Sequence, residues 1–162
     1  MDLDILAQQV GAQLRKQSLR LATAESCTGG WVAKVVTDIA GSSAWFERGF
    51  ITYANEAKQD MLGVRAETLA AHGAVSEATV AEMAEGALAH SRAQVSLAIS
   101  GIAGPGGATL YKPVGLVCFA WSRAGRATVT AAEHFAGDRD AIRRQAVARA
   151  LRGVLDLLQR DV

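Results

Sequence analysis

The stretch LRLATAESCTGGWVAKVVTDIAG, residues 19–41, joins an apolar run, a glycine turn and a helical pattern without interruption. Residues 19–26 are a short apolar segment that ends in polar side chains, which is typical of a buried strand. Residues 27–41 have apolar side chains at helical spacing and end at Gly41, a suitable helix terminator. A strand that passes directly into a helix indicates an α/β unit, with the connecting turn at the carboxyl end of the strand.

The rest of the chain continues this alternation of helices and strands. Further helices are expected at residues 3–16, 55–62, 65–73 and 76–88 and from Asp138 onward, and further strands at 49–55, 94–104, 114–122 and 127–135. Because a hairpin and a long helix follow the alternating part, we predict an α/β layered domain with a mixed sheet flanked by helices. The length favours a single domain over residues 1–162.

Composition excludes several classes of function. Half of the residues are hydrophobic, a fifth are charged and the formal net charge is +1, so nothing calls for a nucleic acid or an anionic membrane as partner. Cys27 and Cys118 lie far apart, without the spacing of a zinc site or a disulfide framework. The chain has no signal-peptide pattern and no apolar run of the roughly 18–20 residues that span a bilayer, so we expect a cytoplasmic protein.

Two segments with many glycines are candidates for binding an anionic group. In the turn after the first strand, free backbone N–H groups at a helix start favour anions, although an ordinary hydroxyl cap explains the same pattern. The loop SGIAGPGG, residues 100–107, can bring backbone N–H groups against a ligand, although surface connections are also rich in glycine. The candidate residues of these segments are Ser26, Thr28, Gly29, Gly30, Gly101, Gly104, Gly106 and Gly107.

The start of the last helix is a third candidate for an anion site. Arg139 and Arg143 are four residues apart and share one face of this helix. Arginine suits bidentate binding of phosphate. A solvated helix face capped by Asp138 is the simpler explanation of the same residues, so the pattern leaves the three phosphate sites unranked.

Ser43, Tyr53 and Lys58 form a candidate catalytic set. Lys58 is expected at the third position of a helix capped by Asn55, where the helix dipole disfavours a cation. If it is also partly buried, its pKa falls, and the neutral amine can take a proton from a serine hydroxyl. Tyr53 would relay this proton or orient the amine. A lysine on a first helical turn and a tyrosine in a strand are also common without any catalytic role.

Six motifs resemble, in their order, those of the CinA C-terminal domain family. They are TAESCTGG, GSSAWFERGFITYANEAK, GAVSE, SGIAGPGG, KPVGLV and FAGDRDAIR. The resemblance implies hydrolysis of the carboxamide of nicotinamide mononucleotide (NMN), with Ser43, Tyr53 and Lys58 as catalytic residues and no metal or organic cofactor. It also implies the stand-alone form of the domain. The segment Thr109–Tyr111 departs from the small or acidic residues that relatives often carry there.

The expected reaction begins when neutral Lys58 draws the proton from Ser43, directly or through Tyr53. Backbone N–H groups near Ser42 or in the glycine loop would hold the oxyanion, and one of the three anion sites would bind the 5′-phosphate. Two rivals remain: a nucleotide-binding regulator that hydrolyses nothing, and a protein of DNA uptake or repair, against which the near-neutral charge argues. The apolar excess and the long last helix predict a homodimer.

Overall fold

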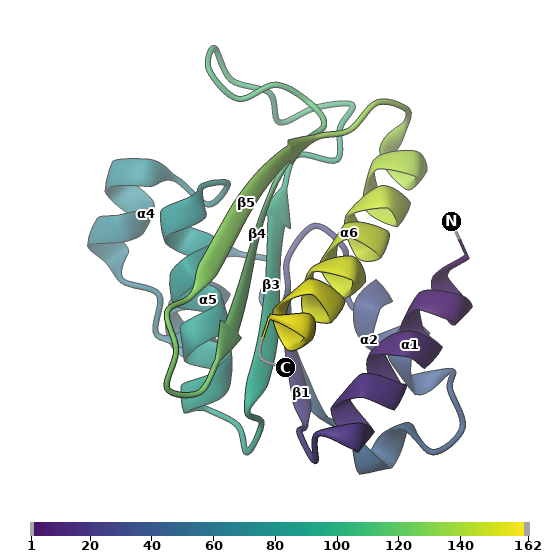
Figure 1. Ribbon diagram of the computed structural model, residues 1–162. Coiled ribbons are helices and arrows are strands. Elements are labelled where there is room, and N and C mark those ends of the chain that lie inside the picture. The colour runs from purple at the N-terminus through teal and green to yellow at the C-terminus, as the bar shows by residue number, and fades with distance from the viewer. Residues whose placement is uncertain (1, 161–162) are drawn as a thin grey trace.

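The computed structural model describes residues 2–160, in which five strands form one mixed sheet (Figure 1). The strands are β1 (Leu21–Glu25), β2 (Phe46–Ile51), β3 (Val95–Gly101), β4 (Leu116–Arg123) and β5 (Val129–His134). Their order is β2-β1-β3-β4-β5, with β1 parallel to both neighbours and the remaining pairs antiparallel. The predicted α/β domain with a mixed sheet is confirmed.

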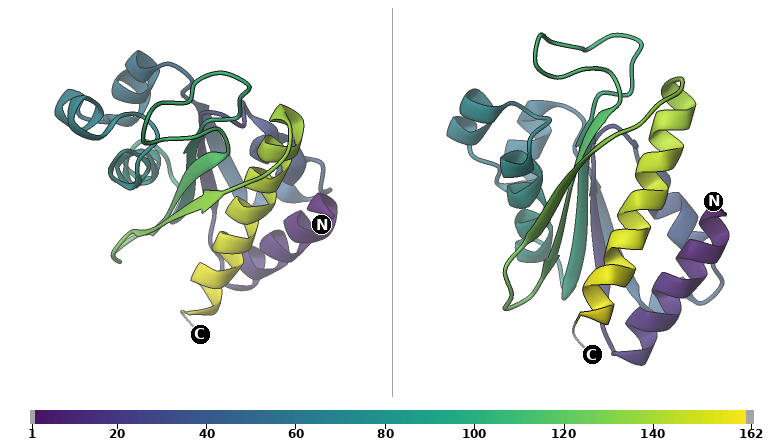
Figure 2. Two further views of the ribbon diagram at one scale, coloured as in Figure 1. Left: turned by 90° about the horizontal axis from the view of Figure 1, so that it is seen from above. Right: turned by 45° about the horizontal axis from the view of Figure 1, so that its top comes forward.

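Helices cover both faces of the sheet (Figure 2). One face carries α1 (Leu3–Lys16), α2 (Trp31–Thr37) and α6 (Arg139–Gln159), and the other carries α3 (Asn55–Leu62), α4 (Ala66–His72) and α5 (Glu77–Ala89). A short 3₁₀ helix, η1 (Ser42–Ala44), precedes β2. None of the helices within residues 2–160 has the length and apolar character needed to cross a membrane.

The two faces of the sheet are built from side chains of different size. Alternate residues of a strand point to opposite faces. In β3, Leu97 and Ile99 therefore join the larger core under α1, α2 and α6, whereas Ala98 joins the core under α3 and α5. The second core uses small strand residues, including Ala24 and Ala120, so that α5 can lie close to the sheet.

One predicted helix start is wrong by one residue. The sequence predicts Asn55 as the cap of α3, but Asn55 is the first residue of the helix and Ala54 is the cap. Lys58 is therefore the fourth residue of α3 and not the third. By contrast, the predicted cap Ser76 is confirmed, because its side chain accepts a hydrogen bond from the backbone N–H of Thr79.

The fold brings several chain segments to the end of the sheet at which the parallel strands β1, β2 and β3 finish, which is called the carboxyl edge below. β1 and β3 are parallel, so the turn after β1 and the loop between β3 and β4 leave the sheet at the same edge. α6 begins at this edge (Figure 1), and α3 follows the carboxyl end of β2 there. Ligand sites of open α/β sheets lie beyond the carboxyl ends of the strands, and the candidate site is built there.

Candidate active site

A cavity of about 260 Å³ lies at the carboxyl edge of the sheet, between β1, β3, α3 and the start of α6. Eight of the residues singled out in the sequence line it, from segments that are far apart in the chain. They are Ser26, Tyr53, Lys58, Gly101, Gly104, Gly106, Gly107 and Arg139. The cavity therefore combines the turn after β1, the start of α3, the glycine loop and one arginine of α6.

Lys58 and Ser26 are hydrogen-bonded in the wall of this cavity. The Nζ of Lys58 lies 3.0 Å from the Oγ of Ser26, 2.9 Å from the carbonyl oxygen of Thr52 and 3.0 Å from that of Tyr53. Only 1% of the Lys58 residue is exposed. The two carbonyls can only accept hydrogen bonds, so they take up two N–H groups of the amine, and the third partner of the nitrogen is the serine hydroxyl.

The environment of Lys58 favours its neutral amine. Burial lowers the pKa of Lys58, because the charged form loses its hydration, and the nearby Cys27 opposes this effect. A neutral amine has two N–H donors and one lone pair. The ammonium form donates to Ser26 Oγ, and the Ser26 hydroxyl lies 3.5 Å from the carbonyl of Tyr53. In the neutral form, with both donors on the carbonyls of Thr52 and Tyr53, the lone pair is directed at Ser26, which is the arrangement that a general base needs.

The Tyr53 side chain lies at the mouth of the cavity and away from the lysine. It is 62% exposed, and its hydroxyl accepts a hydrogen bond from Nη2 of Arg139 at 3.4 Å. The hydrogen bond between Tyr53 and Lys58 is made by the backbone carbonyl of Tyr53, and the phenol is bonded to Arg139 instead. The expected proton relay through the phenol is therefore wrong, whereas the expected closeness of Tyr53 to the lysine is correct.

The expected contact between Ser43 and Lys58 is also wrong. Ser43 belongs to η1, which precedes β2, whereas Lys58 follows β2. Because β2 is parallel to β1, with Phe46 beside Leu21 and Ile51 beside Glu25, the two ends of β2 lie at opposite edges of the sheet. Ser43 and its neighbour Ser42 are therefore remote from the cavity, and the serine beside Lys58 is Ser26.

The predicted phosphate site at Thr28–Gly30 is already filled by a side chain of the protein. The Glu25 carboxylate accepts hydrogen bonds from the backbone N–H groups of Val32 and Ala33 at 2.9 and 3.1 Å, and from the Thr28 hydroxyl at 2.7 Å. These two N–H groups at the start of α2 are among those on which the prediction depended, and the N–H of Trp31 is bonded to the carbonyl of Thr28. Thr28, Gly29 and Gly30 do not line the cavity, so the prediction for them is contradicted.

The two arginines of α6 have different surroundings. Arg139 lines the cavity, and its Nη1 donates to the carbonyl of Gly104 in the glycine loop at 2.8 Å. Arg143 instead donates to the carbonyls of Cys27 and Thr28, at 3.0 and 3.3 Å, behind the turn that carries Ser26. The prediction that both arginines face one ligand is wrong for Arg143, because its guanidinium is hydrogen-bonded to carbonyl groups of this turn.

Some residues of the cavity were not predicted as site residues. Ser100 is the last residue but one of β3 and lines the cavity beside the glycine loop, so a search at the carboxyl ends of the strands, which selects Ser26, also selects Ser100. Burial raises the pKa of the Cys27 thiol to about 11, which keeps this cavity residue protonated beside the serine. Ala74 and Val75 also line the cavity, but their side chains carry no chemical signal.

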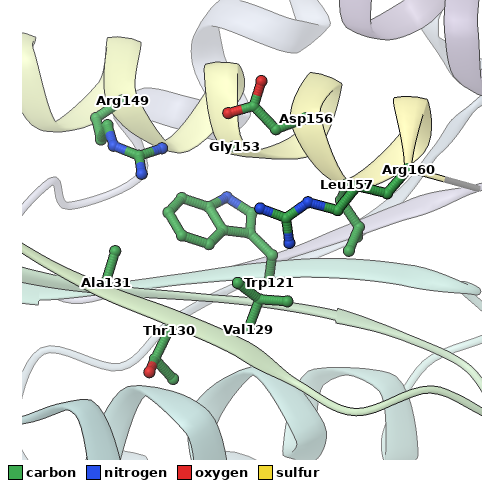
Figure 3. A pocket seen from close by; sticks show the side chains of 9 residues that line it. All are labelled: Trp121, Val129, Thr130, Ala131, Arg149, Gly153, Asp156, Leu157 and Arg160. Carbon is green, nitrogen blue, oxygen red and sulfur yellow. The ribbon is translucent and has the colours of Figure 1, made fainter.

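A second, smaller hollow of about 130 Å³ lies between β4, β5 and α6 (Figure 3). Trp121 forms its floor, with the indole N–H bonded to the carbonyl of Ala150 at 2.9 Å and the Arg149 guanidinium 4.7 Å from the ring centre. Among the described residues that line this hollow, none is a serine, cysteine, lysine or histidine. Within residues 2–160, no group of three or more His, Cys, Asp or Glu side chains is arranged to hold a metal ion.

Fold and site together define an α/β protein with a serine–lysine pair at the carboxyl edge of a mixed sheet. Residues 3–158 match the family model of the CinA C-terminal domain, and the chain belongs to this family.

Similar proteins include enzymes and longer proteins. The chain is 63% identical over 146 residues to the nicotinamide-nucleotide amidohydrolase PncC of Escherichia coli K12, covering 90% of this chain and 88% of that protein. It is 49% identical over 156 residues to a CinA-like protein of Akkermansia muciniphila, covering 96% of this chain and 38% of that longer protein. The crystal structure of the competence/damage inducible protein CihA from Agrobacterium tumefaciens matches with a TM-score of 0.94 and 45% identity, covering 97% and 96% of the two chains.

Proposed function

We propose that the chain hydrolyses the carboxamide of NMN to nicotinate mononucleotide and ammonia, with Ser26 as nucleophile and Lys58 as base. The observation that carries this proposal is the 3.0 Å contact between the buried Lys58 amine and the Ser26 hydroxyl inside a cavity. The names of the similar enzymes, which are nicotinamide-nucleotide amidohydrolases, support the substrate.

The first half of the reaction forms an ester and releases ammonia. The lone pair of neutral Lys58 takes the hydroxyl proton of Ser26 while the Oγ attacks the carboxamide carbon. The ammonium of Lys58 then returns this proton to the departing nitrogen, and ammonia leaves as the acyl–serine ester forms. In the second half Lys58 takes a proton from water while the water oxygen attacks the ester. The ammonium of Lys58 then gives this proton to the departing Oγ of Ser26, which frees nicotinate mononucleotide and restores the serine hydroxyl and the neutral amine.

Backbone N–H groups next to Ser26 are proposed to stabilise the oxyanion. Of the two locations considered from the sequence, the segment at Ser42 lies at the other edge of the sheet, whereas the glycine loop borders the cavity. The N–H of Cys27, the residue after the nucleophile, is a second donor in this proposal. Loss of one such donor typically costs about 2.7–4 kcal/mol of activation free energy.

Arg139 and the glycine loop are proposed to bind the 5′-phosphate. A guanidinium has five N–H donors, and the contacts of Arg139 with Gly104 and Tyr53 leave donors for a phosphate. The exposed phenol of Tyr53 stands beside Arg139 at the cavity mouth. This arrangement orients the nucleotide with its charged end outward and its carboxamide toward Ser26.

Two serine variants test the proposed nucleophile. Ser26→Ala should lower the rate of ammonia release from NMN by about a thousandfold or more, which is typical when an activated nucleophile is removed. Ser43→Ala is the matched control, because this exposed serine lies at the opposite edge of the sheet, and it should keep its activity. Circular dichroism of both variants establishes that they fold. An active Ser26→Ala or an inactive Ser43→Ala would refute the proposal.

We further propose that the chain acts as one domain and as a cytoplasmic homodimer, without a nucleic acid or membrane partner. In the described part of the chain, six large apolar side chains are exposed on several elements. They are Ile5, Ile51, Tyr53, Met61, Leu110 and Tyr111. The adjacent Leu110 and Tyr111 are 87% and 86% exposed, which makes this pair the part of the surface that supports an interface with a second copy. Light scattering after size exclusion should give twice the mass of the 17.0 kDa chain. A monomer at micromolar concentration would contradict the dimer.

A further inference from the structure

Two charged side chains outside the cavity hold the turn that carries Ser26. The first is Glu25, which directly precedes the serine and is only 1% exposed. Its Oε1 accepts from the Thr28 hydroxyl and from the N–H of Val32, and its Oε2 accepts from the N–H of Ala33. These three bonds fasten the turn to the first residues of α2.

The second side chain is Arg143, which reaches the same turn from α6. Its Nε donates to the carbonyl of Cys27 at 3.0 Å and its Nη2 to the carbonyl of Thr28 at 3.3 Å. The guanidinium also lies 5.6 Å from the centre of the Trp31 ring, on the first residue of α2. Arg143 therefore binds the carbonyls of the two residues that directly follow the nucleophile.

The orientation of these peptide groups matters because each one is planar. When Arg143 holds the carbonyl of Cys27, the N–H of Thr28 in the same peptide group must point the opposite way. Ser26 itself is bonded through its backbone, from its N–H to the carbonyl of Ile99 and from its carbonyl to the N–H of Gly29, both at 3.0 Å. With this backbone fixed, the direction of the Ser26 hydroxyl toward Lys58 depends on the shape of the turn.

We propose that Glu25 and Arg143 are positioning residues that hold the Ser26 turn in its reactive shape from two sides. This inference rests on the proposed role of Ser26 as nucleophile. Neither side chain lines the cavity, so both are assigned a role that acts through the turn and not through a contact with the substrate. A misplacement of about 1 Å in a reacting group can cost about a hundredfold in rate, so their loss lowers kcat and leaves KM nearly unchanged.

Arg143→Gln and its neighbour Arg144→Gln form a matched pair for the test. Arg144 lies 5.5 Å from the centre of the same Trp31 ring, but it makes none of the hydrogen bonds that join α6 to the turn. Arg143→Gln should lower kcat for NMN by about ten- to a hundredfold, with KM within about twofold. Arg144→Gln should keep both constants within twofold. An Arg143→Gln enzyme with full kcat, or one in which only KM rises, overturns the proposal.

Two substitutions at Thr28 test the Glu25 side of the turn without removing the buried carboxylate. Thr28→Val keeps the shape of the side chain but loses the hydroxyl that donates to Glu25, whereas Thr28→Ser keeps this hydroxyl. We expect Thr28→Val to lower kcat about tenfold and Thr28→Ser to restore most of it. Equal kcat values for the two variants overturn this half of the proposal. Urea unfolding of each variant measures the loss of stability separately.

Ser26→Ala is measured in the same assay to separate the two levels of the proposal. If Ser26→Ala is inactive and Arg143→Gln is fully active, the nucleophile stands and the positioning role is refuted. If Ser26→Ala remains active, Ser26 is not the nucleophile, and the positioning role that depends on it is refuted as well. Should Arg143→Gln not fold, Arg143→Lys replaces it, because lysine keeps the charge but cannot bond both carbonyls in the same fork geometry. Its kcat should then fall, and an unchanged kcat refutes the role.

Discussion

Lys58 is a buried amine whose three neighbours are two backbone carbonyls and one serine hydroxyl. The sequence predicts a lowered pKa for this lysine from its place at a helix start. The structure gives the same direction with burial as the largest cause. An amine with a lowered pKa is neutral in a larger fraction of molecules at a given pH, and only this form can accept the proton of Ser26.

This pKa shift predicts the direction of the pH dependence. As the pH rises through the pKa of Lys58, the amine loses its proton and kcat/KM for NMN should rise; as the pH falls, the ammonium forms and the rate should fall. The lowered pKa places this rise below the pH at which an ordinary lysine titrates. Initial rates of ammonia release across the pH range measure it, and a rate that increases toward acid would rule out Lys58 as the base.

Lys58→Arg tests the same residue by replacing an amine that can become neutral with a group that stays cationic. Guanidinium does not lose its proton at any working pH, so the variant should release no ammonia even where the wild-type rate is highest. Lys16→Arg, on an exposed position of α1, serves as the control for the substitution itself. Measurable turnover by Lys58→Arg would mean that another group activates the serine.

At the scale of elements, the place of Lys58 depends on how closely α3 packs against α5. Gly86 of α5 faces the last residue of α3, and a Cβ at this position would lie 1.9 Å from the carbonyl oxygen of Leu62. Leu62 and the apolar side of α5 share one core under the sheet. The glycine therefore allows the close approach that sets the position of α3 and of its lysine.

Gly86→Ala should lower the stability of the protein. Alanine in a helix is favoured over glycine by about 1 kcal/mol, but forcing an extra carbon against a packed backbone typically costs about 1–3 kcal/mol or more. We expect a net loss of free energy of unfolding, together with a lower kcat because α3 must shift. Gly106→Ala is the control for stability, since nothing lies within 4 Å of its added Cβ. Urea unfolding decides, and an unchanged or raised stability would contradict the steric argument.

The elements were largely predictable from the sequence, whereas the partner of Lys58 was not: Ser26 was expected to bind an anion, and Ser43 was expected beside the lysine. Apolar periodicity, caps and glycines locate the strands and helices because they act over a few neighbouring residues. Ser43 and Lys58 look close in sequence, but the six-residue strand β2 separates them, which spans about 20 Å at roughly 3.3 Å per residue. Ser26 is 32 residues from Lys58 and yet adjacent in space, because two parallel strands end at the same edge.

Helix starts were a second source of error. The turn TAESCTGG has the serine, threonine and glycines that favour an anion site, and the pattern cannot show that the protein's own Glu25 already occupies the N–H groups. Likewise, Arg139 and Arg143 are one helical turn apart, but Arg139 donates to the glycine loop at the cavity, whereas Arg143 donates to the turn after β1. Whether a backbone N–H group or a guanidinium is available to a ligand depends on its tertiary contacts, and a local sequence pattern does not contain this information.

At the scale of the whole molecule, the loop from residue 102 to 115 ties the two sides of the cavity together. Arg139 of α6 holds it at Gly104, and Lys112 donates a hydrogen bond to the carbonyl of His72 at the end of α4. The loop is thus fastened to helices on both faces of the sheet (Figure 1). The exposed residues Leu110 and Tyr111 lie between Gly104 and Lys112 in the chain.

Lys112→Ala should loosen this loop without unfolding the protein. The lost hydrogen bond is worth about 0.5–1.5 kcal/mol, which corresponds to about a two- to tenfold rise in KM if the substrate must order the loop again. We expect kcat to change less than KM. Steady-state kinetics with NMN measure both constants, with Lys16→Ala as a surface control. A Lys112→Ala enzyme with wild-type KM would show that this bond does not contribute to substrate binding.

The amine of Lys58 is held by the peptide carbonyls of Thr52 and Tyr53, and every amino acid supplies such a carbonyl. Replacement of the side chain at either position therefore keeps both hydrogen bonds to the Lys58 amine, provided that the backbone conformation is unchanged. Substitutions at position 53 can therefore alter the cavity mouth, and with it the ligand that is bound, without changing the hydrogen bonds that hold the Lys58 amine beside Ser26.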